Sequence, residues 1–380
     1  MNNDSRRRIS ADAIIIGAGL HGLSAGMYLA RAGLNSLILE KDYPGRHASG
    51  VNAGGVRRLG RDFAEVPVSV AAMRIWHEIG NLVDDDCGFT PCGQVKVAEN
   101  EAELAAFRRR EGELRGLGFE HEELISRDDL LELVPGIAPH CTGGVWCRDD
   151  GVANPFRTVT AFRRKLQMLG IRIRTGTPVV KIQRLRQTWL IRSPDGDFEA
   201  PVLINTAGAW GGRIAAQLGE PVPIRAEAPM LMITERVKAF LAPVVGAASR
   251  TLSFKQTEND TLLIGGGHRG WAWPEQNRTD IHLPGLRTSA QTVAALFPHL
   301  RDVKIVRFWA GIEGVMPDGI PVIGQSGKER DAYHAFGFSA HGFQLAPIVG
   351  KILADLVLNG ATELPIVPFR ISRFNNPEVT

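Results

Sequence analysis

The sequence has little that would point to a secreted, membrane-bound or nucleic-acid-binding protein. Its 380 residues include only 4 cysteines, and 44 basic side chains nearly balance 41 acidic ones, for a net charge of +3. A charge so close to zero argues against nucleic acid or an anionic membrane as the partner. We expect no apolar run long enough to span a bilayer, and the three arginines at positions 6–8 precede no signal-type region. We therefore expect a cytoplasmic protein.

The cysteines also lack the spacing of a known metal or redox motif. Four residues separate Cys87 from Cys92, and five separate Cys141 from Cys147. Neither spacing matches a C-x-x-C redox pair or a standard zinc or iron–sulfur set. We expect reduced, structural cysteines and no metal site. The alternative is a surface that faces an iron–sulfur partner protein.

The most informative stretch begins with the apolar segment Ala13–Ile16. It leads into residues 17–22, with the sequence GAGLHG, and then into a helix-like segment. A second apolar segment, residues 37–39, stops at Glu40. A G-x-G-x-x-G pattern between two strands, with an acid at the tip of the second, predicts dinucleotide binding. An ordinary strand–turn–helix is the less favoured alternative.

Each glycine of this pattern has a mechanical role. Gly17 permits a tight turn from strand to helix, and Gly19 lets the backbone approach a pyrophosphate. Gly22 allows the helix to pack closely on the sheet. The helix N-terminus then offers free N–H groups to the phosphates. Glu40 can accept hydrogen bonds from the hydroxyl groups of a ribose.

Similar elements recur along the chain. Small-residue turns after apolar runs occur near its start, at residues 207–210 and at residues 337–342, with strand-like segments between them. A chain of this length favours two domains. We predict an α/β fold in which a discontinuous Rossmann-like domain receives an inserted substrate domain built on a mainly antiparallel sheet. The first domain comprises residues 1–80, 150–220 and 305–380, and the second comprises residues 81–149 and 221–304.

Four segments in this order resemble the D-amino-acid oxidase and glycine oxidase family of FAD-dependent amine oxidoreductases. They are the fingerprint ending at Glu40, SGVNAGGVRR at 49–58, NTAGAW at 205–210, and the run WAGIEGVMPDGIPVIG at 309–324 with GFSAHGFQLAP at 337–347. The last turn is most similar to β subunits of bacterial opine oxidases, hydroxyproline dehydrogenases and related sarcosine or proline dehydrogenases.

The resemblance implies FAD as the nucleotide. It implies noncovalent binding, because no cysteine lies near Trp309, where covalent-flavin members have one. The residues it places around FAD are Gly17, Gly19, Gly22, Glu40, Lys41, Ser49, Asn52, Ala53, Gly54, Gly55, Val180, Ala207, Gly208, Gly342, Phe343 and Gln344. It also implies partner subunits that accept electrons, with FMN or an iron–sulfur cluster in, or shared with, those subunits.

The family chemistry resides in the flavin, so we expect no catalytic residue beyond it. The Cα–H of a neutral amine passes as hydride to flavin N5, and water hydrolyses the resulting imine. The candidate substrate contacts are Arg57, His268, Arg269, Glu313 and His341. For each of them a structural role is the alternative. For His21 we expect a contact with the backbone or with a partner subunit rather than with the substrate.

Two positions depart from the family pattern. A flavin-facing lysine of sarcosine-type oxidases aligns with Ile264, which favours a dehydrogenase. A carboxylate-binding arginine of glycine oxidase-like members aligns with Glu313. This exchange favours a cationic substrate group, such as the guanidinium of an arginine-derived opine; an internal ion pair with an arginine is the alternative.

The resulting hypothesis is an FAD-dependent dehydrogenase that oxidises the C–N bond of a secondary or D-configured amino acid of the opine, hydroxyproline or sarcosine/proline type. We expect it to be the catalytic β-type subunit of a heteromeric enzyme. Two alternatives remain open. One is a self-sufficient oxidase that produces hydrogen peroxide, and the other is a noncatalytic flavoprotein subunit that relays electrons.

Overall fold

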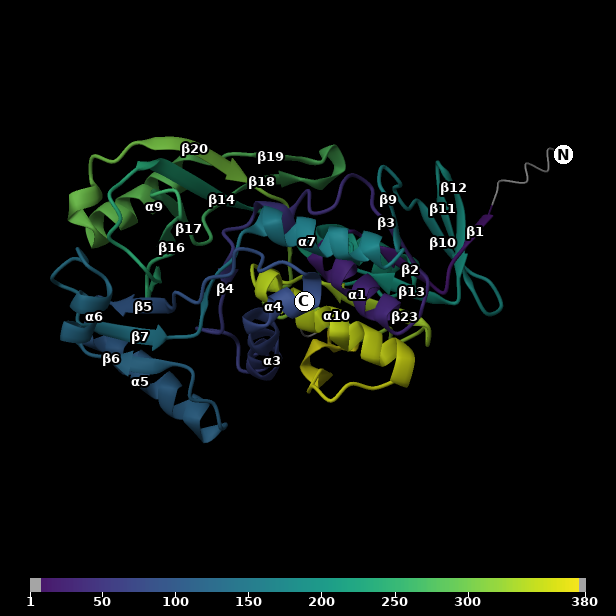
Figure 1. Cartoon of the computed structure of the whole chain (residues 1–380), viewed down its shortest axis with the longest axis horizontal. Helices are drawn as coiled ribbons and strands as arrows, with labels where there is room; N and C mark the ends of the chain where they lie inside the picture. The colour runs from purple at the N-terminus through teal and green to yellow at the C-terminus, as the bar shows by residue number, and fades with distance from the viewer. Residues whose placement is uncertain (1–7, 376–380) are drawn as a thin grey trace.

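The structure is a computed structural model and describes residues 8–375 (Figure 1). Its central element is a six-stranded sheet with the order β22-β23-β13-β2-β3-β9. The pairs that join β13, β2, β3 and β9 are parallel, and β22 runs antiparallel to β23. These strands are β2 (Ala13–Ile16), β3 (Ser36–Leu39), β9 (Arg172–Arg174), β13 (Val202–Asn205), β22 (Val322–Gln325) and β23 (Ala332–Phe336).

Alternate residues of β2 face two different layers. Ile15 lies in a core with the helices, whereas Ile14 and Ile16 face a second, smaller sheet. The helices of the first layer are α1 (Leu20–Arg31), α3 (Val66–His77), α4 (Ile79–Val83), α7 (Pro155–Met168) and α10 (Gly342–Asn359). The second layer contains β1 (Arg8–Ser10), β10 (Lys181–Arg184), β11 (Trp189–Ser193), β12 (Gly196–Ala200) and α8 (Gly211–Gln217). Burial on both faces explains why β2 is apolar throughout.

A second large sheet of 11 strands lies beside this unit (Figure 1). Its pairs are antiparallel except that β15 runs parallel to β5, which agrees with the mainly antiparallel sheet expected. Its strands are β5 (Gln94–Ala98), β6 (Glu123–Ile125), β7 (Gly143–Cys147), β14 (Arg225–Arg236), β15 (Val244–Ala247), β16 (Ser253–Gln256), β17 (Thr261–Gly265), β18 (Arg269–Trp273), β19 (Arg278–Asp280), β20 (Ile305–Ala310) and β21 (Glu313–Val315).

Three helices belong to this part of the chain: α5 (Glu101–Gly116), α6 (Arg127–Leu133) and α9 (Leu283–Leu296). The N-terminus of α6 follows from the sequence, because Ser126 accepts a hydrogen bond from the Asp129 N–H in a capping box. Short elements complete the described chain: α2 (Ala48–Val51), β4 (Gly55–Val56), β8 (Gly151–Val152), η1 (Gly208–Trp210), η2 (Pro274–Gln276), η3 (Pro298–Leu300), η4 (Val367–Phe369) and η5 (Ile371–Phe374).

The strand pairing differs from the expected division of the chain at one place. Residues 305–380 are expected in the nucleotide domain, yet β20 and β21 both pair with β14 of the larger sheet. Strand β14 is long and has two edges. Backbone groups that do not pair with β17 or β18 therefore remain free to pair with β20 and β21. The remaining domain limits stay predictions.

The C-terminal helix α10 departs from the expectation that no apolar run is long enough to span a membrane. Among the described helices, it alone has the length and mean hydropathy, 1.2, of a candidate span, and 61% of it is buried inside the protein. It packs against α1 and α3. Ser24 of α1 donates a hydrogen bond of 3.2 Å to the carbonyl of Pro347, the proline inside α10.

The close contact of α1 with α10 predicts a stability difference between two glycines. A Cβ on Gly350 would lie 2.1 Å from Ser24 Oγ and 2.5 Å from its carbonyl carbon. We expect Gly350→Ala to lower the free energy of unfolding by about 1–3 kcal/mol, the usual cost of overpacking. Urea unfolding followed by circular dichroism measures it. The control is Gly112→Ala, because nothing lies within 4 Å of that Cβ. An equal stability change in both variants would contradict the packing argument.

Candidate active site

The turn between β2 and α1 depends on glycine for its close backbone contacts. Gly17 has a φ of 103°, and a Cβ there would lie 2.6 Å from the carbonyl oxygen of Thr206. A Cβ on Gly22 would lie 2.0 Å from the Gly17 carbonyl oxygen. Gly19 is the N-cap of α1 and makes no side-chain capping bond. The Leu20 N–H donates a 3.0 Å hydrogen bond to Ser49 Oγ, and the other N–H groups at this helix start remain available to an anion.

Glu40 connects the tip of β3 to the same turn. One of its carboxylate oxygens accepts a hydrogen bond of 2.8 Å from the Ala18 N–H, and the other accepts one of 2.9 Å from the Asp42 N–H. Burial raises the pKa of this carboxyl, although both backbone bonds oppose the change. Each oxygen still has a lone pair for a ribose hydroxyl.

A cavity of about 1210 Å³ extends from this turn to the larger sheet. Common small-molecule sites have about 300–1,000 Å³, so there is room for a dinucleotide and a second ligand. Most residues predicted to surround the cofactor line it: Gly17, Gly19, Glu40, Lys41, Ser49, Asn52, Ala53, Gly55, Val180, Ala207, Gly208, Gly342 and Phe343. Four of the five predicted substrate contacts line it too: Arg57, Arg269, Glu313 and His341.

Four predicted residues do not line the cavity. Gly22 packs against the turn, and a Cβ on Gly54 would lie 2.1 Å from the Ala153 carbonyl oxygen, so both serve backbone packing. His268 lies in the connection between β17 and β18, where its carbonyl accepts a hydrogen bond from the Met230 N–H. Gln344 is 1% exposed and faces α3 instead of the cavity.

Gln344 holds the start of α10 in place. Its side-chain amide donates a 2.8 Å hydrogen bond to the Ser69 carbonyl, and its side-chain oxygen accepts one of 3.0 Å from Arg61. Trp76 donates a 2.7 Å hydrogen bond to the Gln344 carbonyl. These contacts fix the α10 N-terminus, where Gly342 and Phe343 face the cavity.

Two histidines beside this helix start are held in the neutral form. Burial lowers the pKa of His21 to about 3, and its ring stacks on Phe338 at 3.7 Å between centroids. Its buried Nε2 has no hydrogen-bond partner among the described residues. Burial, together with Arg61, lowers the pKa of His341 to about 4, although its Nδ1 lies 2.8 Å from Glu65. His21 thus lines the cavity and contacts the Phe338 ring; the expected contact with backbone or a partner subunit stays a prediction.

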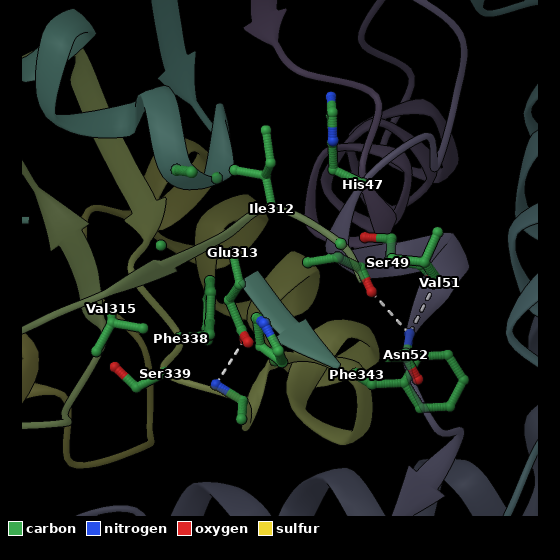
Figure 2. A pocket seen from close by; sticks show the side chains of 18 of the residues that line it. His47, Ser49, Val51, Asn52, Ile312, Glu313, Val315, Phe338, Ser339 and Phe343 are labelled. Atoms are coloured by element: carbon green, nitrogen blue, oxygen red, sulfur yellow. Dashed lines mark hydrogen bonds between the residues drawn. The ribbon is translucent and has the colours of Figure 1, made fainter. Parts of the chain in front are cut away.

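Glu313 points toward a strained turn in the same cavity (Figure 2). Its carboxylate accepts a hydrogen bond of 2.5 Å from the Ala340 N–H, and Ala340 has a φ of 70°. Burial raises the pKa of Glu313 to about 7. The nearest charged neighbours act in opposite directions, because Arg269 lowers this pKa and Glu227 raises it.

The alternative of an internal ion pair for Glu313 finds no direct partner in the described chain. Arg269 is the cation that influences it, but the Arg269 Nε lies 2.6 Å from a carboxylate oxygen of Glu227. Glu227 and Glu313 are directly opposite each other in the pairing of β14 with β21. The arginine therefore neutralises Glu227 and leaves Glu313 facing the cavity.

Sequence reasoning missed several residues that line the cavity. Gln94 and Lys96 of β5 line its inner wall. Neither side chain was among the predicted cofactor or substrate contacts. By contrast, Ile264 is 3% exposed and does not line the cavity. The residue that aligns with the flavin-facing lysine of sarcosine-type oxidases therefore does not reach the cavity in this protein.

The turn between β18 and β19 borders the cavity beside Lys41 and Asp42, at the end nearest Glu40, which is called the nucleotide end below. The sequence did not indicate this contact. Asn277 accepts a hydrogen bond of 2.8 Å from Lys41 and donates one of 2.7 Å to Asp42. Its side-chain oxygen also lies 2.7 Å from His47 Nε2. Burial, together with Lys41, lowers the pKa of His47 to about 4. The Lys41 ammonium lies 3.4 Å from the centre of the Trp210 ring.

Fold and site together define a flavoprotein-type oxidoreductase. Its cavity begins at the dinucleotide-binding turn and continues to the larger sheet, with room for a second ligand. The sequence profile of the family described as "FAD dependent oxidoreductase" matches residues 12–356. The chain belongs to this family of FAD-dependent enzymes. The glycine turn, the Glu40 carboxylate and the α10 N-terminus all line the cavity and fit FAD. None of the four cysteines lines the cavity.

Relatives and solved structures agree with this assignment. The chain is 26% identical to one of the subunits of the opine oxidase of Rhizobium meliloti, over 96% of this chain and 98% of the relative. It is 24% identical to glycine oxidase of Bacillus subtilis strain 168, over 92% and 93%. The crystal structure of L-proline dehydrogenase from P. horikoshii matches with a TM-score of 0.90 and 25% identity, over 97% of this chain and 99% of that one.

The fit of Glu40 to the nucleotide predicts a loss of FAD on charge reversal. Glu40→Arg removes the acceptor for Ala18 N–H and ribose and adds a buried cation. We expect the purified variant to carry much less FAD, measured as the ratio of flavin to protein absorbance after acid release. The control is Asp195→Arg, with the same charge change in the exposed turn between β11 and β12. Undiminished FAD in Glu40→Arg would contradict the assignment.

Proposed function

We propose that the protein oxidises the C–N bond of an amino acid, with a secondary or D-configured amine as the substrate. The observation that supports this most is the pair of opposite groups in one cavity, Arg57 and Glu313. An amino acid carries one carboxylate and one cationic nitrogen, which these groups complement. The names of the relatives, an opine oxidase and a glycine oxidase, favour the same substrate class.

Arg57 is available to hold the substrate carboxylate. Its guanidinium donates a hydrogen bond of 2.6 Å to the Leu59 carbonyl, and further donors remain for a ligand because an arginine has five. Burial lowers the pKa of Arg57, and the carboxylates of Asp150, Glu65 and Glu122 counteract this. The side chain therefore stays cationic in a cavity wall, where a charge-assisted bond is strong.

Glu313 would act on the amine, which departs from the expectation that no residue beyond the flavin takes part in catalysis. A secondary ammonium cannot release hydride until it loses its proton, and a carboxyl with a pKa of about 7 is well matched to accept that proton near neutral pH. Bound FAD would supply the hydride acceptor. The chain itself would orient the Cα–H, hold the carboxylate and remove the proton.

The proposed role of Glu313 predicts a pH profile. Anaerobic flavin reduction by the amino-acid substrate should speed up as the pH rises through about 7, because the carboxylate form then predominates. We expect Glu313→Gln to lose this limb and to slow reduction by about 10²–10⁴-fold, the usual contribution of a general base. Stopped-flow absorbance measures it, with FAD content as the check on folding.

Asp318→Asn is the matched control for this experiment. Asp318 belongs to the same C-terminal run, but its carboxylate binds Arg373 at 2.8 Å and does not line the cavity. Its profile should equal that of the wild type. If Glu313 instead binds a cationic group of the substrate away from the amine, Glu313→Gln will slow flavin reduction only by guanidinium-bearing substrates. The increase of the reduction rate with pH will then persist in that variant. Unchanged reduction of all substrates would refute both roles.

Electrons are proposed to leave through a partner protein. The relative that is one of several subunits of an opine oxidase supports this. In residues 8–375 no group of three histidine, cysteine or acidic side chains could hold a metal ion, so any cluster would be supplied by another chain. Because Ile264 does not line the cavity, it no longer supports electron transfer to a partner protein. The support that remains is the relative that belongs to a multi-subunit enzyme.

This proposal predicts a preference for artificial acceptors over oxygen. Purified protein with a substrate that reduces its flavin should turn over much faster with phenazine methosulfate and an indophenol dye than with air alone. Dye bleaching and peroxide yield, measured in parallel, provide the comparison. Peroxide formation in air at the rate of dye reduction would favour a self-sufficient oxidase. Flavin that no amino acid reduces would favour an electron-relay subunit.

A further inference from the structure

The loop at residues 57–61 and strand β5 bring two cations to one wall of the cavity. The loop follows β4, whereas β5 belongs to the larger sheet (Figure 1). Arg57 of the loop and Lys96 of β5 both line the cavity. Two segments that are distant in the sequence therefore contribute one positive charge each to the same surface.

Both cationic head groups end at a single peptide unit, the one that joins Leu59 to Gly60. The Arg57 guanidinium donates a hydrogen bond of 2.6 Å to the Leu59 carbonyl. A Cβ on Gly60 would lie 2.8 Å from the Lys96 Nζ, so glycine leaves room for the lysine. Burial and, after it, the charge of Arg57 lower the pKa of Lys96, as expected of two neighbouring cations.

This peptide unit is anchored from behind the wall. The Leu59 N–H donates a hydrogen bond of 2.9 Å to Asp150, and the Gly60 N–H donates one of 2.8 Å to Glu122. Gly60 has a φ of 70°, a conformation that favours glycine. The loop therefore holds its backbone in one arrangement, against which the side chains of both cations are placed.

The two anchoring acids are already matched by other cations. Glu122 accepts hydrogen bonds of 2.8 and 2.9 Å from Arg110. Asp150 accepts one of 3.2 Å from Arg58. Both carboxylates are at most 2% exposed, so each needs its partner. Glu122 opposes the lowering of the Lys96 pKa, but its hydrogen bonds go to the arginine and to the loop.

Arg57 and Lys96 are then left without an acid of their own. Among residues 8–375, the Lys96 ammonium makes no hydrogen bond or ion pair, and the Arg57 side chain donates only to a carbonyl. Glu65, a third acid near Arg57, lies 2.8 Å from His341 and 3.9 Å from Arg61. Burying two like charges side by side is costly unless an anion compensates them. The wall therefore lacks an anion that both cations can reach from the cavity.

We propose that Arg57 and Lys96 share one carboxylate of the amino-acid substrate. This inference rests on the proposed oxidation of an amino acid and adds a lysine of the larger sheet to the residues that bind the substrate. A carboxylate suits the site because its two oxygens together offer about four lone pairs, so both cations can donate to it at once. Lys96 then helps to distinguish amino acids from amines that lack the acid.

Methoxyacetate and its amide test the site apart from the redox reaction. Methoxyacetate carries one carboxylate and no amine, so it has no C–N bond to oxidise and no ammonium proton for Glu313 to remove. Methoxyacetamide has nearly the same size and no charge. Binding to the FAD-loaded protein is measured by calorimetry, with the perturbation of flavin absorbance as a second readout. We expect the wild type to bind the carboxylate about 10-fold or more tightly than the amide.

The variant Lys96→Met should lose most of that preference. We expect its Kd for methoxyacetate to rise by about 10- to 100-fold, the range for loss of a charge-assisted hydrogen bond, with little change for methoxyacetamide. Lys96→Arg should retain most of the preference. The control is Lys255→Met, because Lys255 belongs to β16 of the same sheet and does not line the cavity. FAD content confirms that each variant is folded.

The same measurement on Arg57→Met shows whether the carboxylate is shared. Because methoxyacetate has one acidic group, a selective loss in both variants means that both cations bind that group. A loss in Arg57→Met alone would overturn the role of Lys96. So would an equal loss for both ligands in Lys96→Met, the same selective loss in Lys255→Met, or no preference for the carboxylate in the wild type.

A second lysine variant covers a failure of the first to fold. If Lys96→Met does not retain FAD, Lys96→Gln serves the same comparison, since it also removes the charge and keeps a polar group toward the cavity. Binding is measured apart from turnover. A selective loss in a protein whose flavin no amino acid reduces would sink the oxidation proposal and leave the carboxylate site standing, whereas flavin reduction without a selective loss would sink the site alone.

Discussion

The contact between the β2–α1 turn and the end of β13 is the constraint on which the rest of the structure depends. Gly17 and Gly22 allow two backbone segments, far apart in sequence, to meet at the centre of the parallel sheet. Thr206 secures this meeting, because its hydroxyl lies 2.9 Å from the Ile16 carbonyl oxygen. Since no side chain fits there, the helix N-terminus stays where a phosphate can reach it, and the cavity extends outward from that point.

The second half of the site depends on a different principle. Around the glycine turn, backbone groups provide the recognition, whereas charged side chains form the wall beside the larger sheet. Arg58, Arg61 and Arg110 each neutralise a buried carboxylate and thereby fix the loop that carries Arg57. Such a network is costly to build, because every buried charge must be compensated. Arg57 and Lys96 line the cavity beside this network.

Local patterns in the sequence predict the elements that depend on local chemistry. The glycine turn and the capping box at Ser126 are both evident because their signals lie within a few residues. The surroundings of Lys96 are not, since its cavity forms only where β5 meets a loop from residues 57–61. The interest of Glu313 as a candidate comes from the resemblance to a family. That Arg269 pairs with Glu227 and not with Glu313 can be recognised only from the pairing of β14 with β21.

The side chain of Asn277 ties the two parts of the molecule together across the nucleotide end of the cavity. It reaches from the turn after β18 to Lys41, Asp42 and His47 at once. These contacts tie the β18–β19 turn to three residues that follow Glu40, so any displacement of the turn from the nucleotide end would break all of them at once.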